Sequence, residues 1–365
     1  MTRLNVVVTG GAGFIGSAVV RHFAGLGHSV TNIDKLTYAG NLASVECVAD
    51  RPNYRFLEAD ICDAEAMGKA FAAAKPDAVI HLAAETHVDR SIDDPLVFIR
   101  TNVLGTAVLL ETALAYLGTL APGERERFRF LHVSTDEVFG QLDDDGAFVE
   151  ESPYRPRSPY AASKAGADHL VRSWGETYGL PVIVTNSSNN YGPYQFPEKV
   201  IPTVIRNALA GDSIPVYGDG RNVRDWIHVE DHTRAIAAIL ERAAPGRPYN
   251  IGAGNQVRNI DLVNMICAIL DELAPRAGGA PHGERIAFVA DRPGHDYRYA
   301  IDSKRLTREL GWAPEIEFSP GLRDTVAWYM EHREWLSPAR QSLGRLGLSR
   351  STGRALPTAQ PAGRN

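Results

Sequence analysis

The feature that most constrains the fold is a glycine-rich segment, Thr9 to Gly16, which joins an apolar run to a stretch with helical spacing. Glycines at positions 10, 13 and 16 allow a tight turn, close approach of a pyrophosphate and close packing of helix on strand. The free N–H groups and positive dipole end of the helix favour phosphate. The segment therefore predicts a dinucleotide site at the start of the chain.

Asp34 ends the next apolar run and indicates which dinucleotide binds. A carboxylate at this position can bind both hydroxyls of the adenosine ribose. It would repel a 2′-phosphate, so the sequence predicts NAD rather than NADP.

Short apolar runs alternate with helical stretches over residues 1–186. The predicted strands are residues 4–9, 29–34, 54–58, 78–82, 130–134 and 182–185, and the first helix is 14–26. This alternation predicts an α/β fold, a Rossmann-like doubly wound parallel sheet with helices on both faces.

Three regions follow from the change in pattern along the chain. Residues 1–186 are expected to form the NAD-binding domain, with later segments returning to it. Residues 187–336 lose the strict alternation and are expected to form mainly a smaller α/β substrate-binding lobe. Residues 337–365 contain no Asp or Glu and are rich in Gly, Ser, Pro, Ala and Arg, which predicts a disordered tail.

Composition excludes several classes of protein. The formal net charge of -6 gives no sign of nucleic-acid binding. Cys47, Cys62 and Cys267 are too few and too scattered for a disulfide framework or a Cys-rich metal site, so no metal is expected. No run of 18 apolar residues and no signal-peptide pattern is present, so we expect no membrane span and a cytoplasmic location.

Tyr160 and Lys164 stand four residues apart, which places them on one face of a helix. Ser158 and Pro159 predict that this helix begins just before Tyr160. The Lys ammonium and the helix N-terminus both favour tyrosinate and are expected to lower the tyrosine pKa. Such a tyrosine can take a proton from a sugar hydroxyl while a cofactor takes hydride from the same carbon. Taken alone, the motif is equally compatible with an ordinary surface helix.

Other cofactor contacts are expected after the ends of the predicted strands. Asp60 and Ile61 follow the third strand, where an Asp could meet the adenine, although a helix N-cap is the alternative role for Asp60. Small residues at 82–84 let the backbone approach the cofactor. The complete predicted cofactor set is Gly10, Gly13, Phe14, Ile15, Gly16, Asp34, Lys35, Thr37, Asp60, Ile61, Leu82, Ala83, Ala84, Thr101, Tyr160 and Lys164.

The motifs GGAGFIG, LAA at 82–84, STDE at 134–137 and YAASK at 160–164 occur in the order typical of one family. Over residues 4–335 the chain resembles the extended short-chain dehydrogenase/reductase family. Within it, residues 84–91, 135–140, 189–202, 224–226 and 291–296 are most similar to the dTDP-glucose 4,6-dehydratases. One departure lies at residues 185–188, where family members usually carry an Arg before the Ser/Asn run.

The resemblance implies oxidation of a nucleotide hexose at C4, elimination of water across C5 and C6, and return of hydride to C6. dTDP-glucose would become dTDP-4-keto-6-deoxyglucose. Asp136 would be the acid and Glu137 the base, and Thr135 would hydrogen-bond the C4 oxygen beside Tyr160. Taken without context, Asp136 and Glu137 would be a solvated loop pair.

The same resemblance implies a substrate site and an assembly. The residues placed at the nucleotide sugar are Thr86, Asn190, Glu198, Lys199, Pro215, Tyr217, Arg224, Asn259, Arg292 and His295. The role of His87 stays open. A homodimer is expected through the helix after Pro95 and the helix that begins near Tyr160. The alternatives are a nucleotide-sugar 4-epimerase, which needs no C5 base, and a non-catalytic NAD-sensing protein.

Overall fold

The computed structural model describes residues 3–337 of the 365. The tail predicted from residue 337 onward therefore lies, apart from Ser337, outside the described residues.

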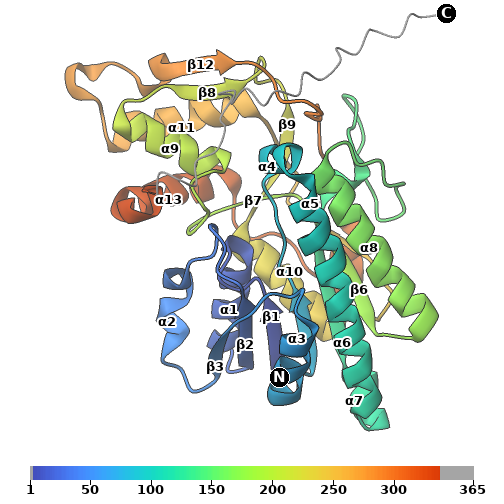
Figure 1. The fold of residues 1–365 in the computed structure, drawn as a ribbon. Coiled ribbons are helices and arrows are strands. Elements are labelled where there is room, and N and C mark those ends of the chain that lie inside the picture. Colours follow the sequence, from blue (N-terminus) through green and yellow to red (C-terminus); the bar gives the residue numbers. More distant parts are fainter. Residues whose placement is uncertain (1–2, 338–365) are drawn as a thin grey trace, which may run out of the picture.

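A seven-stranded parallel sheet forms the centre of the molecule, with strand order β10-β6-β5-β4-β1-β2-β3 (Figure 1). Its strands are β1 Asn5–Thr9, β2 Ser29–Asp34, β3 Tyr54–Glu58, β4 Ala78–His81, β5 Arg129–Thr135, β6 Val182–Ser187 and β10 Tyr249–Ile251. The order reverses between β1 and β4, and in such sheets ligands bind beyond the carboxyl ends of the strands at this point. The predicted doubly wound fold is confirmed.

Helices cover both faces of the sheet. On one face α1 contributes Val19 and α10 contributes Ile236 to the core, and on the other face α6 contributes Leu109 and α8 contributes Val171. The helices around the sheet are α1 Phe14–Gly25, α2 Glu46–Ala49, α3 Ala64–Ala74, α4 Val88–Asp93, α5 Pro95–Phe98, α6 Gly105–Thr119, α7 Pro122–Arg127, α8 Pro159–Tyr178, α10 Val229–Arg242 and α12 Lys304–Leu310.

A smaller lobe lies across the end of the sheet (Figure 1). It has its own apolar core, to which Ile205, Leu262 and Val326 belong. Its elements are β7 Asn189–Tyr191, α9 Val200–Ala210, β8 Ile214–Tyr217, β9 Val223–His228, β11 Asn255–Arg258, α11 Asn259–Leu273, β12 Ile286–Val289 and α13 Phe318–Glu331. The strands form a three-stranded sheet, β11-β9-β7, and a two-stranded sheet, β12-β8. Short 3-10 helices cover Leu42–Val45, Asp136–Phe139, Ala277–Gly279, His282–Arg285 and Arg333–Leu336.

One helical stretch, Pro95–Thr119, is long and apolar enough to cross a membrane by length and composition. It consists of α5, a π-helical segment Ile99–Leu104, and α6. Leu109, Leu110 and Ala113 are fully buried in the core beneath the sheet. Packing in the core therefore accounts for the apolar character of its inner face.

Candidate active site

A cavity of about 460 Å³ lies between the carboxyl ends of the sheet strands and the smaller lobe. Every predicted site residue except Asp60 lines it. These lining residues are Gly10, Gly13, Phe14, Ile15, Gly16, Asp34, Lys35, Thr37, Ile61, Leu82, Ala83, Ala84, Thr86, Thr101, Thr135, Asp136, Glu137, Tyr160, Lys164, Asn190, Glu198, Lys199, Pro215, Tyr217, Arg224, Asn259, Arg292 and His295.

The glycine loop fits a dinucleotide. Gly10 has φ 74°, and a Cβ there would lie 2.7 Å from the backbone of Ala83. Only glycine therefore fits at this position of the loop. Helix α1 begins after Gly13, and no side chain caps its N-terminus. Its first N–H groups are thus left for an anion such as a pyrophosphate.

Hydrogen bonds fix the position of the Asp34 carboxylate at the end of β2. Its two carboxylate oxygens accept hydrogen bonds from the backbone N–H groups of Ala12 (3.0 Å) and Leu36 (2.9 Å). Burial raises its pKa, and these two hydrogen bonds oppose that rise. The carboxylate therefore lies at the edge of the glycine loop, as a ribose-binding acid requires.

Asp60 is not brought to the cavity wall, although its neighbour Ile61 is. Its Oδ1 accepts from the Cys62 N–H at 2.9 Å, and its Oδ2 lies 3.7 Å from Lys35 Nζ. The alternative role as a helix N-cap is wrong, because Asp63 is the residue that caps α3, and the adenine contact stays a prediction. Asp60 forms an ion pair with Lys35. Lys35 itself lines the cavity and donates to Thr101 Oγ1 at 3.2 Å.

Helix α8 begins at Pro159, as predicted, and Ser158 Oγ accepts from the Ala161 N–H at 3.1 Å. Tyr160 and Lys164 are 8% and 4% exposed, which excludes an ordinary surface helix at this point. Lys164 Nζ donates to the Val133 carbonyl at 2.9 Å. The motif is thus anchored to the end of β5.

The sequence predicted a lowered pKa for Tyr160, and this prediction is wrong for the protein alone. Burial raises the pKa of Tyr160, and the negative charge of Glu137 raises it further, while a hydrogen bond with Thr135 opposes the rise. Lys164 directs its ammonium to a backbone carbonyl and does not offset the loss of water. The sequence argument counted the ammonium and the helix dipole, but it had no measure of burial.

Asp136 and Glu137 follow β5 directly. The Thr135 Oγ1 accepts from the Glu137 N–H at 3.3 Å and starts a 3-10 helix, which turns both carboxyls toward the cavity. Burial raises the pKa of Asp136 well above its ordinary value, and the charges of Glu137 and Asp225 add to the effect. This environment favours the protonated form of Asp136.

Glu137 has a different environment. Burial raises its pKa, but the cations Arg292, Arg224 and Lys199 all lower it. The pKa values of the two adjacent carboxyls are therefore expected to differ, with Asp136 suited to donate a proton and Glu137 to accept one.

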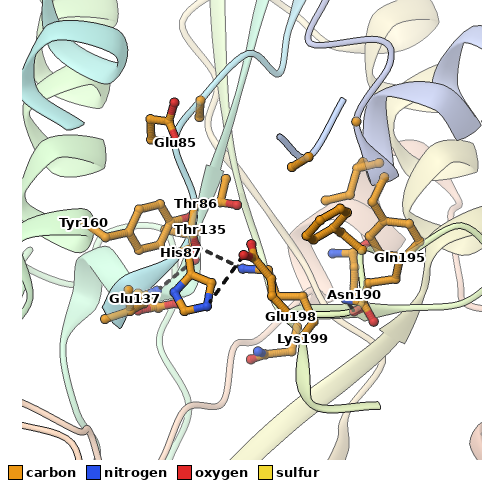
Figure 2. A pocket seen from close by; sticks show the side chains of 18 of the residues that line it. Glu85, Thr86, His87, Thr135, Glu137, Tyr160, Asn190, Gln195, Glu198 and Lys199 are labelled. Carbon is orange, nitrogen blue, oxygen red and sulfur yellow. Dashed lines mark hydrogen bonds and ion pairs between the residues drawn. The ribbon is translucent and has the colours of Figure 1, made fainter. Parts of the chain in front are cut away.

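The smaller lobe supplies the opposite wall. In Figure 2, Tyr160, Thr135 and Glu137 lie on one side of the cavity, and Asn190, Glu198 and Lys199 lie on the other. Lys199 Nζ donates to the Thr86 carbonyl at 3.0 Å. Glu198 Oε1 accepts from Tyr38 OH at 3.1 Å. The two lobes are thus joined by polar contacts across the cavity.

Cations gather at the far end of the cavity. The Arg224 guanidinium stacks over the Tyr299 ring at 4.3 Å and donates to the Asp296 carbonyl at 2.9 Å. Arg292 lies 3.7 Å from Asp89, which also accepts from Tyr217 OH at 2.8 Å. Paired arginines of this kind suit a diphosphate.

Some buried polar atoms at the cavity have no hydrogen-bond partner among the described residues. They include Asp136 Oδ2, Ser188 Oγ and Glu198 Oε2. Because buried polar atoms are nearly always paired, these three point to a polar ligand.

Several lining residues were not predicted. They are Glu85, Ser187, Ser188, Gln195 and Tyr299, together with His87, whose role was left open. Ser187 ends β6 and Ser188 follows it, much as Asp136 and Glu137 follow β5, so the strand-end rule could have found them. Burial lowers the pKa of His87 to about 3, which leaves it neutral 3.7 Å from Glu198.

The fold and the site together define a dinucleotide-binding protein of the extended short-chain dehydrogenase/reductase type. The family model described as GDP-mannose 4,6 dehydratase matches residues 7–325, and the chain belongs to this family.

Individual relatives of known name are similar to this chain over about nine tenths of its length. A probable dTDP-glucose 4,6-dehydratase from Sinorhizobium fredii is 54% identical over 94% of this chain and 99% of its own length. A solved dTDP-glucose 4,6-dehydratase from Streptomyces venezuelae with NAD bound is 44% identical, with a TM-score of 0.81, and covers 90% of this chain and 98% of its own. A UDP-glucose 4-epimerase from Thermus thermophilus, solved with NAD, is 30% identical with a TM-score of 0.78 and covers 89% of this chain and 98% of its own.

Proposed function

We propose that this protein is a hydro-lyase that uses NAD to convert dTDP-glucose into dTDP-4-keto-6-deoxyglucose and water. The observation that carries the proposal is the carboxyl pair, Asp136 and Glu137, beside Tyr160, in which burial raises both pKa values and more cations oppose the rise at Glu137. The relatives named dTDP-glucose 4,6-dehydratase support the choice of substrate.

The residues divide the reaction into three steps. Tyr160, as the tyrosinate, takes the proton of the C4 hydroxyl, while Thr135 hydrogen-bonds the same oxygen. The resulting ketone makes the C5 proton acidic, and Glu137 removes it. Asp136 donates a proton to the C6 hydroxyl, which leaves as water. NAD, held by the glycine loop and Asp34, would supply hydride chemistry, an acceptor for the C4 hydride and its donor to C6, with no net consumption of cofactor.

The cofactor would lie along the sheet edge. Gly10, Gly13 and Gly16 would admit the pyrophosphate, and Asp34 would bind the adenosine ribose. Fixed phosphate and ribose contacts would place the nicotinamide beside Tyr160 and Thr135, because these residues line the same cavity.

The substrate would occupy the side of the smaller lobe. Arg224, Arg292 and Asn259 would hold the diphosphate, with Pro215 and Tyr217 near the base. The sugar would lie among Thr86, Asn190, Glu198 and Lys199, with His295 as a further contact. A carboxyl-bearing wall on one side and cations on the other would orient C5 and C6 toward Glu137 and Asp136.

We further propose the division into an NAD-binding domain over residues 1–186 and a nucleotide-sugar lobe over 187–336, with β10 and α12 returning to the first. β10 pairs with β6 in the main sheet, and Leu306 of α12 packs in the core beside it.

A homodimer built on the long helices is the proposed assembly, and the compartment is the cytoplasm. The predicted apolar residues separate into two faces, since Leu109 and Leu110 are buried in the core while Leu104 is 53% exposed. Leu96 at 75% and Ile99 at 46% extend the exposed face along the same helical stretch. A second copy would cover this face in a four-helix arrangement with α8.

Incubation of the purified protein with a panel of nucleoside-diphosphate hexoses tests the function. We expect dTDP-glucose to give a product lighter by one water, as seen by mass spectrometry. A product of unchanged mass with inverted C4 would identify an epimerase. Tightly bound NAD without turnover of any sugar would identify a binding protein.

A further inference from the structure

A fully buried carboxylate, Asp168, lies one turn along α8 from Lys164 and has no part in the steps above. It is 0% exposed. An ionised carboxylate taken out of water is costly unless donors surround it. Its surroundings therefore indicate whether it carries a charge.

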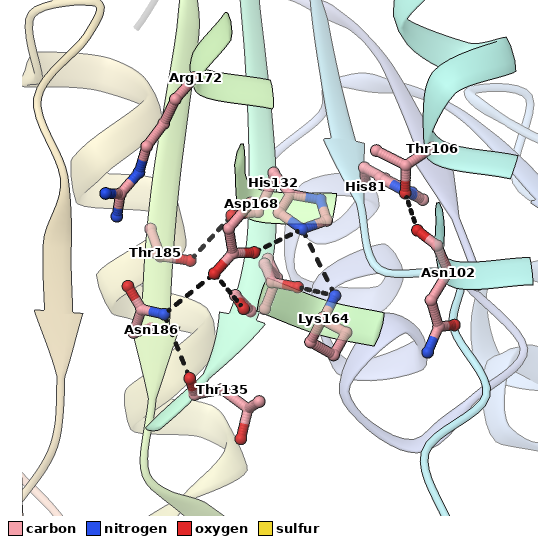
Figure 3. A network of polar contacts seen from close by, with 12 residues as sticks. His81, Asn102, Thr106, His132, Thr135, Lys164, Asp168, Arg172, Thr185 and Asn186 are labelled. Carbon is pink, nitrogen blue, oxygen red and sulfur yellow. Dashed lines mark hydrogen bonds and ion pairs between the residues drawn. The ribbon is translucent and has the colours of Figure 1, made fainter. Parts of the chain in front are cut away.

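Four side chains surround the Asp168 carboxylate with donors, and Figure 3 shows two of them, His132 and Asn186. Its partners are Ser134 Oγ at 2.8 Å, Tyr154 OH at 2.9 Å, His132 Nε2 at 3.1 Å and Asn186 Nδ2 at 3.4 Å. Burial alone would raise the pKa of Asp168, but the hydrogen bond with His132, the charge of Lys164 and the hydrogen bond with Ser134 lower it below its ordinary value. Asp168 is thus an ionised carboxylate in the core.

The His132 imidazole lies between Asp168 and Lys164, and its Nε2–H donates to Asp168, so the ring does not accept a hydrogen bond from Lys164. His132 Nε2 is 3.1 Å from Asp168 Oδ1 and 3.5 Å from Lys164 Nζ. Lys164 donates to the Val133 carbonyl, and no ion pair joins it directly to a carboxylate among the described residues. The charge of Asp168, one ring away, is therefore what compensates the buried ammonium.

The network also fixes the end of β5. Asn186 Nδ2 donates to the Thr135 carbonyl at 3.1 Å as well as to Asp168. Ser134, the other β5 donor, directly precedes Thr135. Asn186 belongs to the segment that departs from the family's usual Arg, so this position serves the network around Asp168.

We propose that Asp168 is a positioning residue of the reaction: through His132 and the end of β5 it holds Lys164 in place and supplies the buried negative charge that keeps the lysine an ammonium beside Tyr160. The catalytic role of Lys164 rests on the proposed function, whereas its pairing with Asp168 does not.

Asp168 is the charged group that compensates the Lys164 ammonium, because the other titratable side chains around Lys164 do not supply a negative charge to it. His81 of β4 and His132 of β5 are neutral, because burial holds the pKa of His81 well below its ordinary value and lowers that of His132 to about 4. Glu137 raises the pKa of Tyr160 on α8, whereas Asp168 is the charge that acts on the pKa of Lys164. Burial lowers the pKa of Lys164 to about 8, and Asp168 opposes that fall. Loss of the Asp168 charge must therefore lower the Lys164 pKa further.

The test is a direct titration of Lys164 in the intact protein. Competitive acetylation with acetic anhydride over a pH series, read by peptide mass spectrometry, gives its pKa without requiring turnover. We expect Asp168→Asn, which preserves shape, to lower this pKa by roughly 1 unit or more, as loss of a nearby opposite charge does. Asp168→Glu keeps the charge and should restore it in part.

Tyr154→Phe is the matched control, because it removes one hydrogen bond to Asp168 but leaves the carboxylate. It should leave the Lys164 pKa unchanged. In single turnovers with dTDP-glucose, Asp168→Asn should slow C4 oxidation by about 10-fold or more with little change in KM, which corresponds to about 1.4 kcal/mol.

An unchanged Lys164 pKa in Asp168→Asn, or an equal fall in Tyr154→Phe, would overturn the proposal. If Asp168→Asn does not fold, Asp168→Ser provides the same comparison with a smaller neutral group. A wild-type protein that does not dehydrate dTDP-glucose would refute the proposed function, but it would leave the Lys164 titration as a separate result.

Discussion

Replacement of Glu137 by Gln keeps the shape of the side chain and removes its ability to accept the C5 proton. The substitution should separate oxidation from elimination. The Glu137 charge is one reason that the Tyr160 pKa is high, second only to burial. Its removal lowers the Tyr160 pKa, so C4 oxidation should proceed at least as fast as in the wild type.

Elimination should fall sharply. A positioned general base contributes about 10²- to 10⁴-fold, or roughly 2.7–5.4 kcal/mol. We expect the lower end of this range, about 10²-fold, because Glu137 is only partly buried and water can reach its position. Oxidation without elimination then traps reduced nicotinamide on the protein.

Rapid mixing of the variant with dTDP-glucose would follow this directly. The absorbance of reduced nicotinamide should rise and persist, while release of the dehydrated sugar slows. Glu126→Gln, the same chemical change at an exposed position on α7, should behave as the wild type. Dehydration at the wild-type rate in Glu137→Gln would refute the assignment of the base.

Other substitutions test the rest of the site. Tyr160→Phe should abolish C4 oxidation while NAD binding, measured by calorimetry, stays nearly intact; turnover near the wild-type rate would end the assignment. Lys164→Ala should be severely impaired, because it removes a buried cation one helical turn from Tyr160. Asp34 should make NAD bind at least roughly 10-fold more tightly than NADP, a difference of about 1.4 kcal/mol, and equal affinities would contradict the ribose-binding role. Light scattering should show a dimer at micromolar concentration, and Leu104→Asp should weaken it.

Local sequence patterns were sufficient for most of the main sheet. The strands at 29–34 and 54–58 agree with β2 and β3 residue for residue, because each contains β-branched or aromatic residues and follows a turn, at Gly27 and at Pro52–Asn53. β10 was not specified, since three residues, Tyr249–Ile251, carry too little periodicity to be distinguished from a loop.

The site shows a similar division. Residues that follow strand ends, such as Asp136 and Ser188, could be located from the order of elements alone. The protonation state of each group could not be predicted in this way, because its pKa depends on burial and on charges that tertiary packing brings together. Asp168 is the clearest case: in sequence it is one polar residue on a helix, and only packing turns it into a buried anion beside Lys164.

The most direct test of the proposed dehydration is turnover of dTDP-glucose labelled with deuterium at C4 in one experiment, and of unlabelled sugar in heavy water in another. If Glu137 exchanges the C5 proton and hydride passes from C4 to C6 within one active site, the labelled sugar gives product with deuterium at C6. Heavy water gives product with deuterium at C5. A C5 position that keeps its original hydrogen, or a product that differs only in C4 configuration, would contradict the dehydratase mechanism.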